Sequence, residues 1–422
     1  MFEQIGLIVG AAICVGVLLQ LVMMTLTSLR RVVDDRRARE LELELLRTQI
    51  EASRKRRALT AEAEKAWEGW RKFEVFRKVV EAADTSSIYL RPHDKRPLPG
   101  FAPGQYLTFQ LNVPGQDKPL VRCYSLSDSA REDYYRVTIK KVPPPRDKPE
   151  LPPGRSSTFF NEVVAEGDIL DVKAPHGAFY LDMTRDNPVV LIGGGIGITP
   201  VLSMLNAIVD SGSKRETWFF LGVRGGKDHP FKEHLQQIAA EHENVHLHVC
   251  YSNPTDADVE GKDYQHAERV SKDLFQRLLP SNNYQYYLCG PGPFMEAVVG
   301  GLEDWGVPSD NIHFEAFGPA SVKKAKPPAP KTDAPAAEAV EITFAKSGKK
   351  LQWDGSFENV LELAEANGVM IDSGCRAGNC GTCITAIKNG KVKYPKDTGI
   401  EVEAGSCLTC ICAPDGPLEL DA

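Results

Sequence analysis

The sequence predicts a multi-domain protein with one N-terminal transmembrane helix, an antiparallel β-barrel, a parallel α/β domain and a small C-terminal domain with a cysteine loop. Three observations predict this class. An uncharged stretch of 26 residues, Gln4 to Leu29, lies near the start of the chain. Short alternating strands then give way, near residue 184, to strands that alternate with helices. Closely spaced cysteines follow a Pro- and Ala-rich segment near the C-terminus.

Composition excludes some classes of function. At 422 residues the chain is long enough for two or three domains, each with its own core. Its net charge of -7 argues against a nucleic-acid-binding protein, because phosphate binding needs a basic face. Ten cysteines in a chain of this length do not make a disulfide scaffold.

Residues 1–29 are predicted to anchor the protein in a membrane. As a helix, 26 residues would extend about 39 Å, enough to cross a hydrocarbon core of about 30 Å. A cleaved signal peptide fits less well, because the segment has neither a positive n-region nor a small-residue cleavage site. Positive charge beside a membrane stays on the cytoplasmic side. We therefore expect one pass through the cell inner membrane and a cytoplasmic C-terminal part, from the arginines that follow: Arg30, Arg31, Arg36, Arg37 and Arg39.

The remaining chain divides by composition. Residues 30–70 contain no proline and are rich in Arg, Glu, Leu and Ala, which predicts a charged helical stalk. A short coiled coil is the alternative, but the heptads are not sustained. Residues 71–183 show the alternation of a small antiparallel barrel, and 184–318 the strand–helix alternation of a parallel α/β domain. A Pro- and Ala-rich linker, 319–338, joins them to a compact module at 339–422.

The cysteine loop has the spacing of a [2Fe–2S] site. Cys375, Cys380 and Cys383 follow the plant-type pattern C-x4-C-x2-C, which is an unusual spacing for zinc. Glycines between them allow the tight bends that three converging thiolates require. The fourth ligand must come from "CLTCIC", where Cys407, Cys410 and Cys412 compete.

The cysteine loop resembles that of plant-type ferredoxins, whose fourth cysteine lies in an "LTC" context. This resemblance implies Cys410 as the fourth ligand of one [2Fe–2S] cluster. The segment before the loop, which reads as strand, turn, strand and helix, is similar to the β-grasp fold of that family.

The barrel segment resembles the flavin domain of the ferredoxin–NADP reductase superfamily. The string "RCYSLSDS" is similar to the family's R-x-Y-S motif, and "GRSSTFFNEV" to its G-x-x-S. The resemblance implies that Arg122 meets the flavin phosphate, that Tyr124 packs on the isoalloxazine and that Ser125 hydrogen-bonds near its reactive nitrogen. A diphosphate contact implies FAD rather than FMN and falls to Gly154, Ser157 and Thr158, at a helix N-terminus.

The α/β segment carries a glycine turn where a buried strand passes into a helix. Such a turn lets a dinucleotide pyrophosphate approach the backbone and the helix N-terminus. "GGGIGITP" resembles the GGxGxTP of the same superfamily, which implies that the nicotinamide cofactor is bound by Gly193, Gly194, Gly195, Gly197, Thr199 and Pro200.

Two further strings imply residues near the hydride donor. In "YLCGPGPFM" the resemblance places Cys289, Gly290 and Pro291 beside the nicotinamide, although Cys289 also fits a buried core thiol. In "FEAFGP" it places Phe317 against the flavin face with Glu315 nearby, and interdomain packing is the alternative.

These strings together imply the reacting groups and the preferred nucleotide. The catalytic candidates are Ser125, Cys289 and Phe317. NADH is expected rather than NADPH: Arg224 could meet a 2′-phosphate, but "GGKDHP" after it lacks a cluster of phosphate-binding side chains.

The resemblance covers residues 72 to 422, and the order flavin, nicotinamide, ferredoxin is that of phthalate dioxygenase reductase-like proteins. It implies an electron-transfer reductase that passes electrons from NADH through FAD and the cluster to a partner. With an anchor, we expect a membrane oxygenase, hydroxylase or desaturase as that partner. The alternatives are an NADH:quinone oxidoreductase component, resembling the sodium pump's reductase part, and a redox-sensing module.

Overall fold

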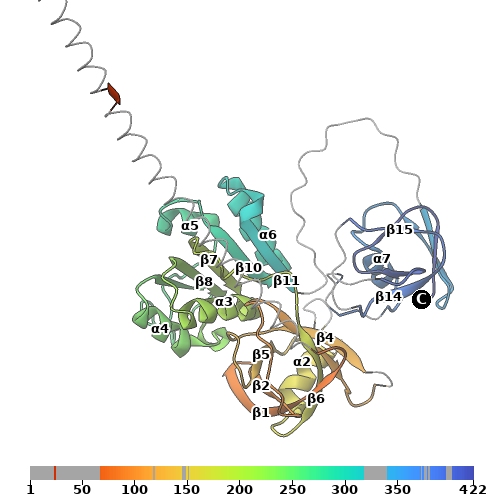
Figure 1. The fold of residues 1–422 in the computed structure, drawn as a ribbon, viewed down its shortest axis with the longest axis horizontal. Coiled ribbons are helices and arrows are strands. Elements are labelled where there is room, and N and C mark those ends of the chain that lie inside the picture. The colour runs from red at the N-terminus through yellow and green to blue at the C-terminus, as the bar shows by residue number, and fades with distance from the viewer. Residues whose placement is uncertain are drawn as a thin grey trace, which may run out of the picture. The chain divides into compact units, whose positions relative to one another are not determined.

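A computed structural model describes residues 23–24, 67–116, 119–144, 149–150, 152–317, 340–371, 373–374, 378, 381–395 and 402–422 (Figure 1). The predicted anchor, stalk and linker lie almost entirely outside these residues. Within the described residues, no helix is both long and apolar enough to cross a bilayer. The other three predicted architectures, barrel, α/β domain and ferredoxin-like domain, are confirmed.

The first domain is an antiparallel barrel of six strands in the order β4-β3-β6-β1-β2-β5. A bridge between Leu126 and Val137 links the end of β4 to β5 and closes the sheet. Inward-facing aromatic and branched side chains fill its core, among them Phe73, Phe109 and Phe160. The elements are β1 (Arg71–Ala82), β2 (Thr85–Pro92), β3 (Tyr106–Leu111), β4 (Leu120–Ser125), β5 (Tyr135–Lys140), β6 (Ile169–His176) and the helical segments α2 (Arg155–Thr158) and η1 (Phe159–Val163).

Trp67 belongs to the barrel, although it falls in the range predicted as stalk. Its indole N–H donates to the carbonyl of Val172 at 3.0 Å, and its ring lies 5.4 Å from that of Phe73. The Arg71 guanidinium lies over the Trp67 ring and pairs with Asp94, which holds the pKa of that carboxyl well below its usual range. The barrel core therefore begins before its first strand.

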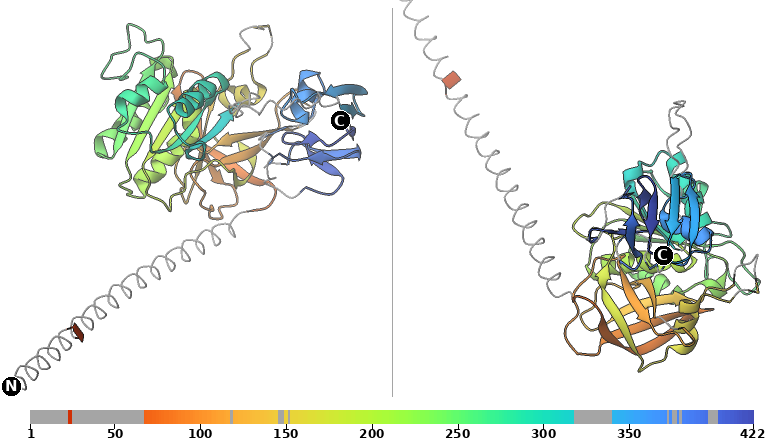
Figure 2. Two further views of the ribbon diagram at one scale, coloured as in Figure 1. Left: turned by 90° about the horizontal axis from the view of Figure 1, so that it is seen from above. Right: turned by 90° about the vertical axis from the view of Figure 1, so that its right-hand side faces the viewer.

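The second domain is a five-stranded parallel sheet in the order β11-β10-β7-β8-β9. Helices cover both faces, α3 and α4 on one and α5 and α6 on the other (Figure 2). Alternate residues of β7 serve the two cores: Val189 and Leu191 face one, Val190 and Ile192 the other. The elements are β7 (Val189–Gly194), η2 (Gly195–Gly197), α3 (Ile198–Asp210), β8 (Thr217–Val223), η3 (Gly226–Asp228), α4 (Lys232–Glu241), β9 (Val245–Tyr251), α5 (Lys272–Leu278), β10 (Gln285–Pro291), α6 (Gly292–Asp304), η4 (Ser309–Asn311) and β11 (Ile312–Phe317).

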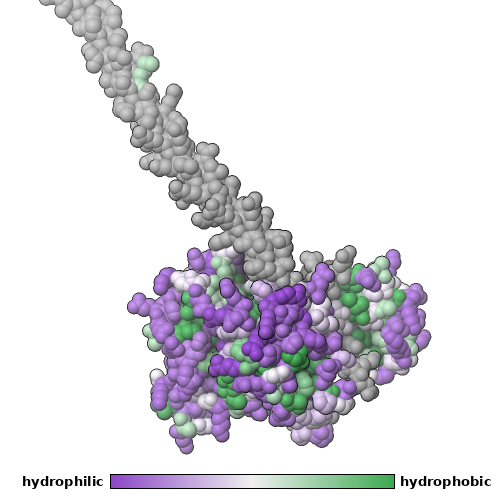
Figure 3. Space-filling model, turned by 60° about the horizontal axis from the view of Figure 1, so that its bottom comes forward, coloured by the Kyte–Doolittle hydropathy of each residue, from purple (hydrophilic) through white to green (hydrophobic). Residues whose placement is uncertain are grey.

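The C-terminal domain is a mixed sheet in the order β13-β12-β18-β14-β16 with a second sheet of β15 and β17. Its β12 and β18 run parallel and its other pairs antiparallel, the pattern of a β-grasp. The elements are β12 (Val340–Phe344), β13 (Lys349–Trp353), α7 (Val360–Ala366), β14 (Ile384–Asn389), β15 (Val392–Lys393), β16 (Ser406–Leu408), β17 (Ala413–Pro414) and β18 (Leu418–Leu420). On the face shown in Figure 3, hydrophilic side chains predominate and hydrophobic ones form small groups.

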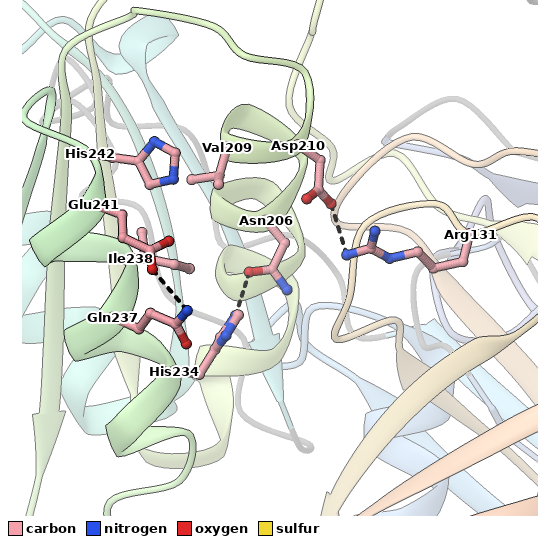
Figure 4. Close-up of a pocket in the computed structure, with 9 residues that line it drawn as sticks. All are labelled: Arg131, Asn206, Val209, Asp210, His234, Gln237, Ile238, Glu241 and His242. Atoms are coloured by element: carbon pink, nitrogen blue, oxygen red, sulfur yellow. Dashed lines mark hydrogen bonds and ion pairs between the residues drawn. The ribbon is translucent and has the colours of Figure 1, made fainter.

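A buried polar network joins the barrel to the α/β domain. Asp128, in the loop after β4, accepts a hydrogen bond from the amide of Asn206 on α3 at 2.8 Å, and its backbone carbonyl accepts one from Ser203 at 2.6 Å. The Asn206 amide oxygen meets His234 of α4 at 2.8 Å (Figure 4). Arg131 pairs with Asp210 at 2.9 Å beside a cavity of about 150 Å³. These contacts set the orientation of the two domains.

Candidate functional site

The end of β4 holds the three residues predicted to meet the flavin. The Tyr124 ring packs edge-on against Phe109 and Phe160, and its hydroxyl bonds the Ser156 hydroxyl at 2.7 Å. Burial raises the pKa of Tyr124 to about 12, so the phenol stays neutral. Arg122, two residues earlier on the strand, is half-buried and donates from Nη1 to the carbonyl of Val121 at 2.7 Å.

The turn at α2 offers one hydroxyl for an anion. Ser157 is already engaged: its Oγ donates to the carbonyl of Gly154 at 2.9 Å and accepts the N–H of Val142 at 3.0 Å. The Thr158 Oγ1, in contrast, is buried and has no hydrogen-bond partner in the described part of the chain. A buried hydroxyl without a partner needs an explanation, and a flavin diphosphate would supply one. Ser156, which orients Tyr124, carries no signal in the motif.

The glycine turn after β7 disfavours side chains by close packing at Gly197 and by its backbone conformation at Gly195. A Cβ at Gly197 would lie 2.1 Å from the carbonyl oxygen of Cys289, and Gly195 has a φ of +55°. The Thr199 hydroxyl donates to the carbonyl of Ile196 at 3.1 Å and holds the turn. Buried Pro200 follows in the first turn of α3.

The N-terminus of α3 fits a pyrophosphate. This 13-residue helix has no side-chain cap and no acidic residue in its first turn. Its N–H groups and positive dipole end thus favour an anion, and the glycines let the anion approach.

The carboxyl ends of β10 and β11 lie beside this turn. Cys289 is fully buried and in register with Glu315 on β11. A Cβ at Gly290 would meet the ring of Phe294 at 2.6 Å, and a Cβ at Gly194 would meet the same ring at 2.7 Å. Phe294 of α6 therefore packs against the glycines that end β7 and β10, a role that the sequence did not reveal.

Buried Ser125, half-buried Glu315 and fully buried Cys289 form a polar group between the two domains. The Ser125 hydroxyl donates to the Glu315 carboxyl, whose Oε2 is buried and without a partner among the described residues. Burial raises the pKa of Glu315 to about 7. Burial, and then the nearby carboxyl, raise the pKa of the Cys289 thiol well above its usual value. The Glu315 carboxyl is therefore the member of this group that can exchange a proton near neutral pH.

Two other predicted residues lie at the carboxyl ends of β10 and β11. Pro291 ends β10, and its register partner on β11 is Phe317. The backbone of Phe317 thus reaches the domain junction, but its side chain lies outside the part of the molecule that the structure describes.

The cysteine loop brings two of the four predicted ligands together. The Cys383 and Cys410 sulfurs lie 3.0 Å apart, both buried. Cys375 and Cys380 lie outside the described residues. Among the residues that the structure does describe, no group of three potential metal-binding side chains occurs. The Thr385 and Thr409 hydroxyls donate to the carbonyl of Cys383 at 3.3 and 3.1 Å, which ties the loop to the segment after β16.

The competing cysteines face a different environment. Cys407 and Cys412 are fully buried in the main β-grasp core, with Ile342 and Phe344. Cys410 lies in a separate cluster with Cys383. Gly378 has a φ of +75°, and a Cβ there would lie 2.4 Å from Ile411, so the loop backbone approaches the Cys410 segment closely. Two converging buried thiols beside a glycine loop fit the donor set of a [2Fe–2S] cluster.

Three family models match the chain. An oxidoreductase FAD-binding domain matches residues 72–180, an oxidoreductase NAD-binding domain matches 191–300, and a 2Fe-2S iron–sulfur cluster binding domain matches 346–415. The cofactors FAD, NADH and one [2Fe–2S] cluster, predicted from the sequence, are thereby confirmed.

Curated relatives match about three fifths of the chain. A flavohemoprotein of Bacillus anthracis is 40% identical over 261 residues, which are 62% of this chain and 64% of that protein. A flavohemoprotein of Chromobacterium violaceum is 38% identical over 256 residues, 61% of this chain and 62% of that protein. The chain thus spans slightly less than two thirds of the length of these relatives.

Solved structures match two or all three of the domains. The FAD/NAD-binding domain of nitric oxide dioxygenase from Vibrio cholerae is 31% identical, with a TM-score of 0.52. The match includes 59% of this chain and 99% of that domain. Phthalate dioxygenase reductase, described as modular for electron transfer from pyridine nucleotides to [2Fe-2S], is 26% identical with a TM-score of 0.51. The match includes 84% of this chain and 98% of that reductase.

Proposed function

The chain belongs to the FAD- and NAD-binding oxidoreductases, here with a fused [2Fe–2S] domain, and from this premise we propose that it delivers NADH-derived electrons to a membrane-bound acceptor. The observation that carries the proposal is the order of the domains. A flavin barrel, a nicotinamide domain and a ferredoxin-like domain follow one another as in phthalate dioxygenase reductase, which the chain covers almost completely. The cofactors supply hydride acceptance by FAD and one-electron transfer by the cluster.

The chain's own residues bind and orient these groups. Tyr124 offers a fixed aromatic wall, Thr158 a free hydroxyl for a phosphate, and the N-terminus of α3 a site for the nucleotide pyrophosphate. Ser125 and Glu315 hold a proton between the domains. We assign the [2Fe–2S] cluster to Cys375, Cys380, Cys383 and Cys410. Of the three "CLTCIC" cysteines, Cys410 packs in the same group of buried side chains as Cys383, whereas the other two pack in the main β-grasp core.

The acceptor that we propose is a membrane oxygenase, hydroxylase or desaturase. The uncharged segment Gln4 to Leu29, followed by arginines, supports an inner-membrane anchor with the reductase in the cytoplasm. A tethered donor remains close to a membrane client, which raises the effective concentration of the pair. The Pro- and Ala-rich linker supports a ferredoxin domain that reaches both the flavin and the acceptor.

The electron path is tested on the detergent-solubilised, cofactor-loaded full chain. Anaerobic NADH should bleach the flavin absorbance and produce the electron paramagnetic resonance signal of a reduced [2Fe–2S] cluster. Cys410→Ser should lose that signal and keep flavin bleaching, whereas Cys412→Ser should keep both. A chain that binds no flavin or iron, or that NADH does not reduce, contradicts the proposal.

The acceptor is tested separately. We expect a membrane oxygenase, hydroxylase or desaturase to co-purify with the solubilised chain and to accept electrons from it when NADH is added. NADH oxidation stimulated by a quinone, with no protein acceptor present, would instead favour the quinone reductase alternative. Slow reduction of both ferricyanide and cytochrome c would favour a redox sensor.

A further inference from the structure

The turn after β8 and the loop after β9 are locked together at the carboxyl end of the parallel sheet. The N–H of Ser252 donates to the carbonyl of Val223 at 3.0 Å, and the N–H of Asn253 donates to the carbonyl of Arg224 at 2.8 Å. These bonds extend the strand pair beyond the sheet. They hold the loop from residue 252 to 258 over the turn from 224 to 228.

An acidic side chain of this loop enters the turn. The Asp258 Oδ1 accepts the backbone N–H of Gly226 at 3.1 Å. Its Oδ2 accepts both the N–H of Thr255 at 2.7 Å and the Thr255 hydroxyl at 2.9 Å. The Thr255 N–H, with the Thr255 hydroxyl and the Gly226 N–H, lowers the pKa of Asp258, so the carboxylate is charged at neutral pH.

The turn is shaped for this carboxylate. A Cβ at Gly226 would lie 2.3 Å from Asp258 Oδ1, so glycine lets the carboxylate keep this position, whereas a larger residue would require it to move. A Cβ at Gly225 would lie 3.3 Å from Oδ2. The φ of Gly225 is -176°, extended backbone that any residue adopts, so the close approach and not the backbone conformation favours a small residue there.

The position of the turn relates it to the nucleotide. In a sheet whose first strand ends in the pyrophosphate-binding glycine turn, the residues after the adjacent second strand meet the adenosine ribose. Here β7 ends in the glycine turn and β8 is its neighbour, so residues 224 to 228 follow the second strand. NADPH differs from NADH by a phosphate on that ribose, and backbone N–H groups are phosphate ligands.

We propose that Asp258 makes this chain select NADH, by occupying the Gly226 N–H and presenting a fixed negative charge where a 2′-phosphate would bind. The inference rests on the proposed NADH site at the ends of β7 and β8. Arg224, the residue that the sequence offered for a 2′-phosphate, lies exposed in the same turn. Its attraction for phosphate is opposed by a carboxylate that the adjoining loop holds in place.

The test uses the flavin-loaded full chain and its variants Asp258→Ala and Asp258→Asn. The matched control is Asp256→Asn, because Asp256 is an exposed acidic residue of the same loop. With ferricyanide as acceptor, Asp258→Ala should raise the ratio of kcat/KM for NADPH to that for NADH by about tenfold or more, the size of one charge-assisted hydrogen bond. Asp258→Asn should raise it less, and the control should leave it unchanged.

A binding measurement separates selectivity from turnover. Titration calorimetry should show Asp258→Ala binding 2′-AMP about tenfold more tightly than wild type, with 5′-AMP binding unchanged. An unchanged selectivity ratio, or KM values for NADH and NADPH that rise together with a lower melting temperature, would show that Asp258 only staples the loop and would overturn the inference. A wild-type chain that oxidises neither nucleotide would instead overturn the proposed function.

Discussion

At the residue scale, the folded structure raises the pKa of the Glu315 carboxyl into a range where the effect on stability can be measured. Its carboxyl has a pKa of about 7 in the folded protein against an ordinary value of 4.5. Between these two pH values the unfolded chain releases a proton that the folded chain keeps. The free energy of unfolding should therefore fall as the pH rises from about 4.5 to about 7, and it should level off above that.

Glu315→Gln tests this pH dependence. The variant cannot lose a proton, so at pH 8 its free energy of unfolding should exceed that of wild type by roughly 2–3 kcal/mol. Urea unfolding of the flavin-loaded chain at pH 5 and pH 8 measures the difference. Glu296→Gln, at an exposed position, should behave as wild type. Equal pH dependence in the wild-type and Glu315→Gln chains would refute the raised pKa.

Replacement by alanine should have opposite effects on stability at two glycines of the α/β domain. Gly197→Ala places a Cβ 2.1 Å from the carbonyl of Cys289, where the backbone must move, so NADH oxidation and the melting temperature should both fall. Gly300→Ala, inside α6 with nothing within 4 Å, should stabilise the chain by about 0.5–1 kcal/mol. Thermal unfolding of the two variants is the measurement. A neutral Gly197→Ala would mean that the turn after β7 is not packed against β10.

At the element scale, the loop after β4 holds the barrel on helices α3 and α4. Asp128 is almost fully buried and accepts hydrogen bonds from Tyr134 at 2.9 Å and Asn206 at 2.8 Å. Burial by itself would raise its pKa, but the charge of Arg136 and the Tyr134 hydroxyl outweigh burial and lower it. One carboxylate thus satisfies donors from both domains.

Asp128→Ala should remove this support and leave the Arg136 guanidinium buried without its carboxylate. Loss of one partner of a buried ion pair costs about 3–5 kcal/mol, so the free energy of unfolding should fall by that order. Urea unfolding checks the value, and the rate of flavin reduction by NADH should fall because the domains lose their orientation. Exposed Glu132 in the same loop is the control, and Glu132→Ala should change neither quantity. A loss below about 1 kcal/mol would be typical of a surface pair and would contradict this role.

At the scale of the whole molecule, the domain order supports the proposed function, in which one chain handles both two-electron and one-electron chemistry. The barrel and the parallel sheet each have a separate core, and the glycine turn after β7 contacts strand β5 of the barrel. The β-grasp domain has its own core as well, which includes Ile342 and Phe344.

The anchor prediction belongs to this scale. We expect the full chain to sediment with membranes and to need detergent for release, because 26 uncharged residues favour the bilayer. A chain that starts at Glu64, the first residue of the compact unit, should remain in the supernatant and still reduce ferricyanide with NADH. Fractionation and activity assays decide this, and a full chain found in the supernatant without detergent would contradict the anchor.

The sequence by itself determined the domain types, the three cofactors and the strings that carry them. Local spacing indicates the cluster and the nucleotide turn, because C-x4-C-x2-C and a glycine turn between a strand and a helix involve only a few neighbouring residues. FAD was implied by the resemblance of "RCYSLSDS" to a known family. The buried strand β7 and the helix after it also follow from the sequence, as an apolar run that a glycine turn separates from a helical segment.

Only the tertiary structure decided which residues far apart in the chain share a site. It placed Cys410, the ligand implied by the resemblance, beside Cys383, brought the Glu315 carboxyl to Ser125, and brought Asp258 to the turn at Gly226. No spacing rule predicts such contacts, because they depend on how separate strands and loops pack. Desolvation and charge pairing, which set the pKa of Glu315 and of Asp128, exist only once those surfaces have left water.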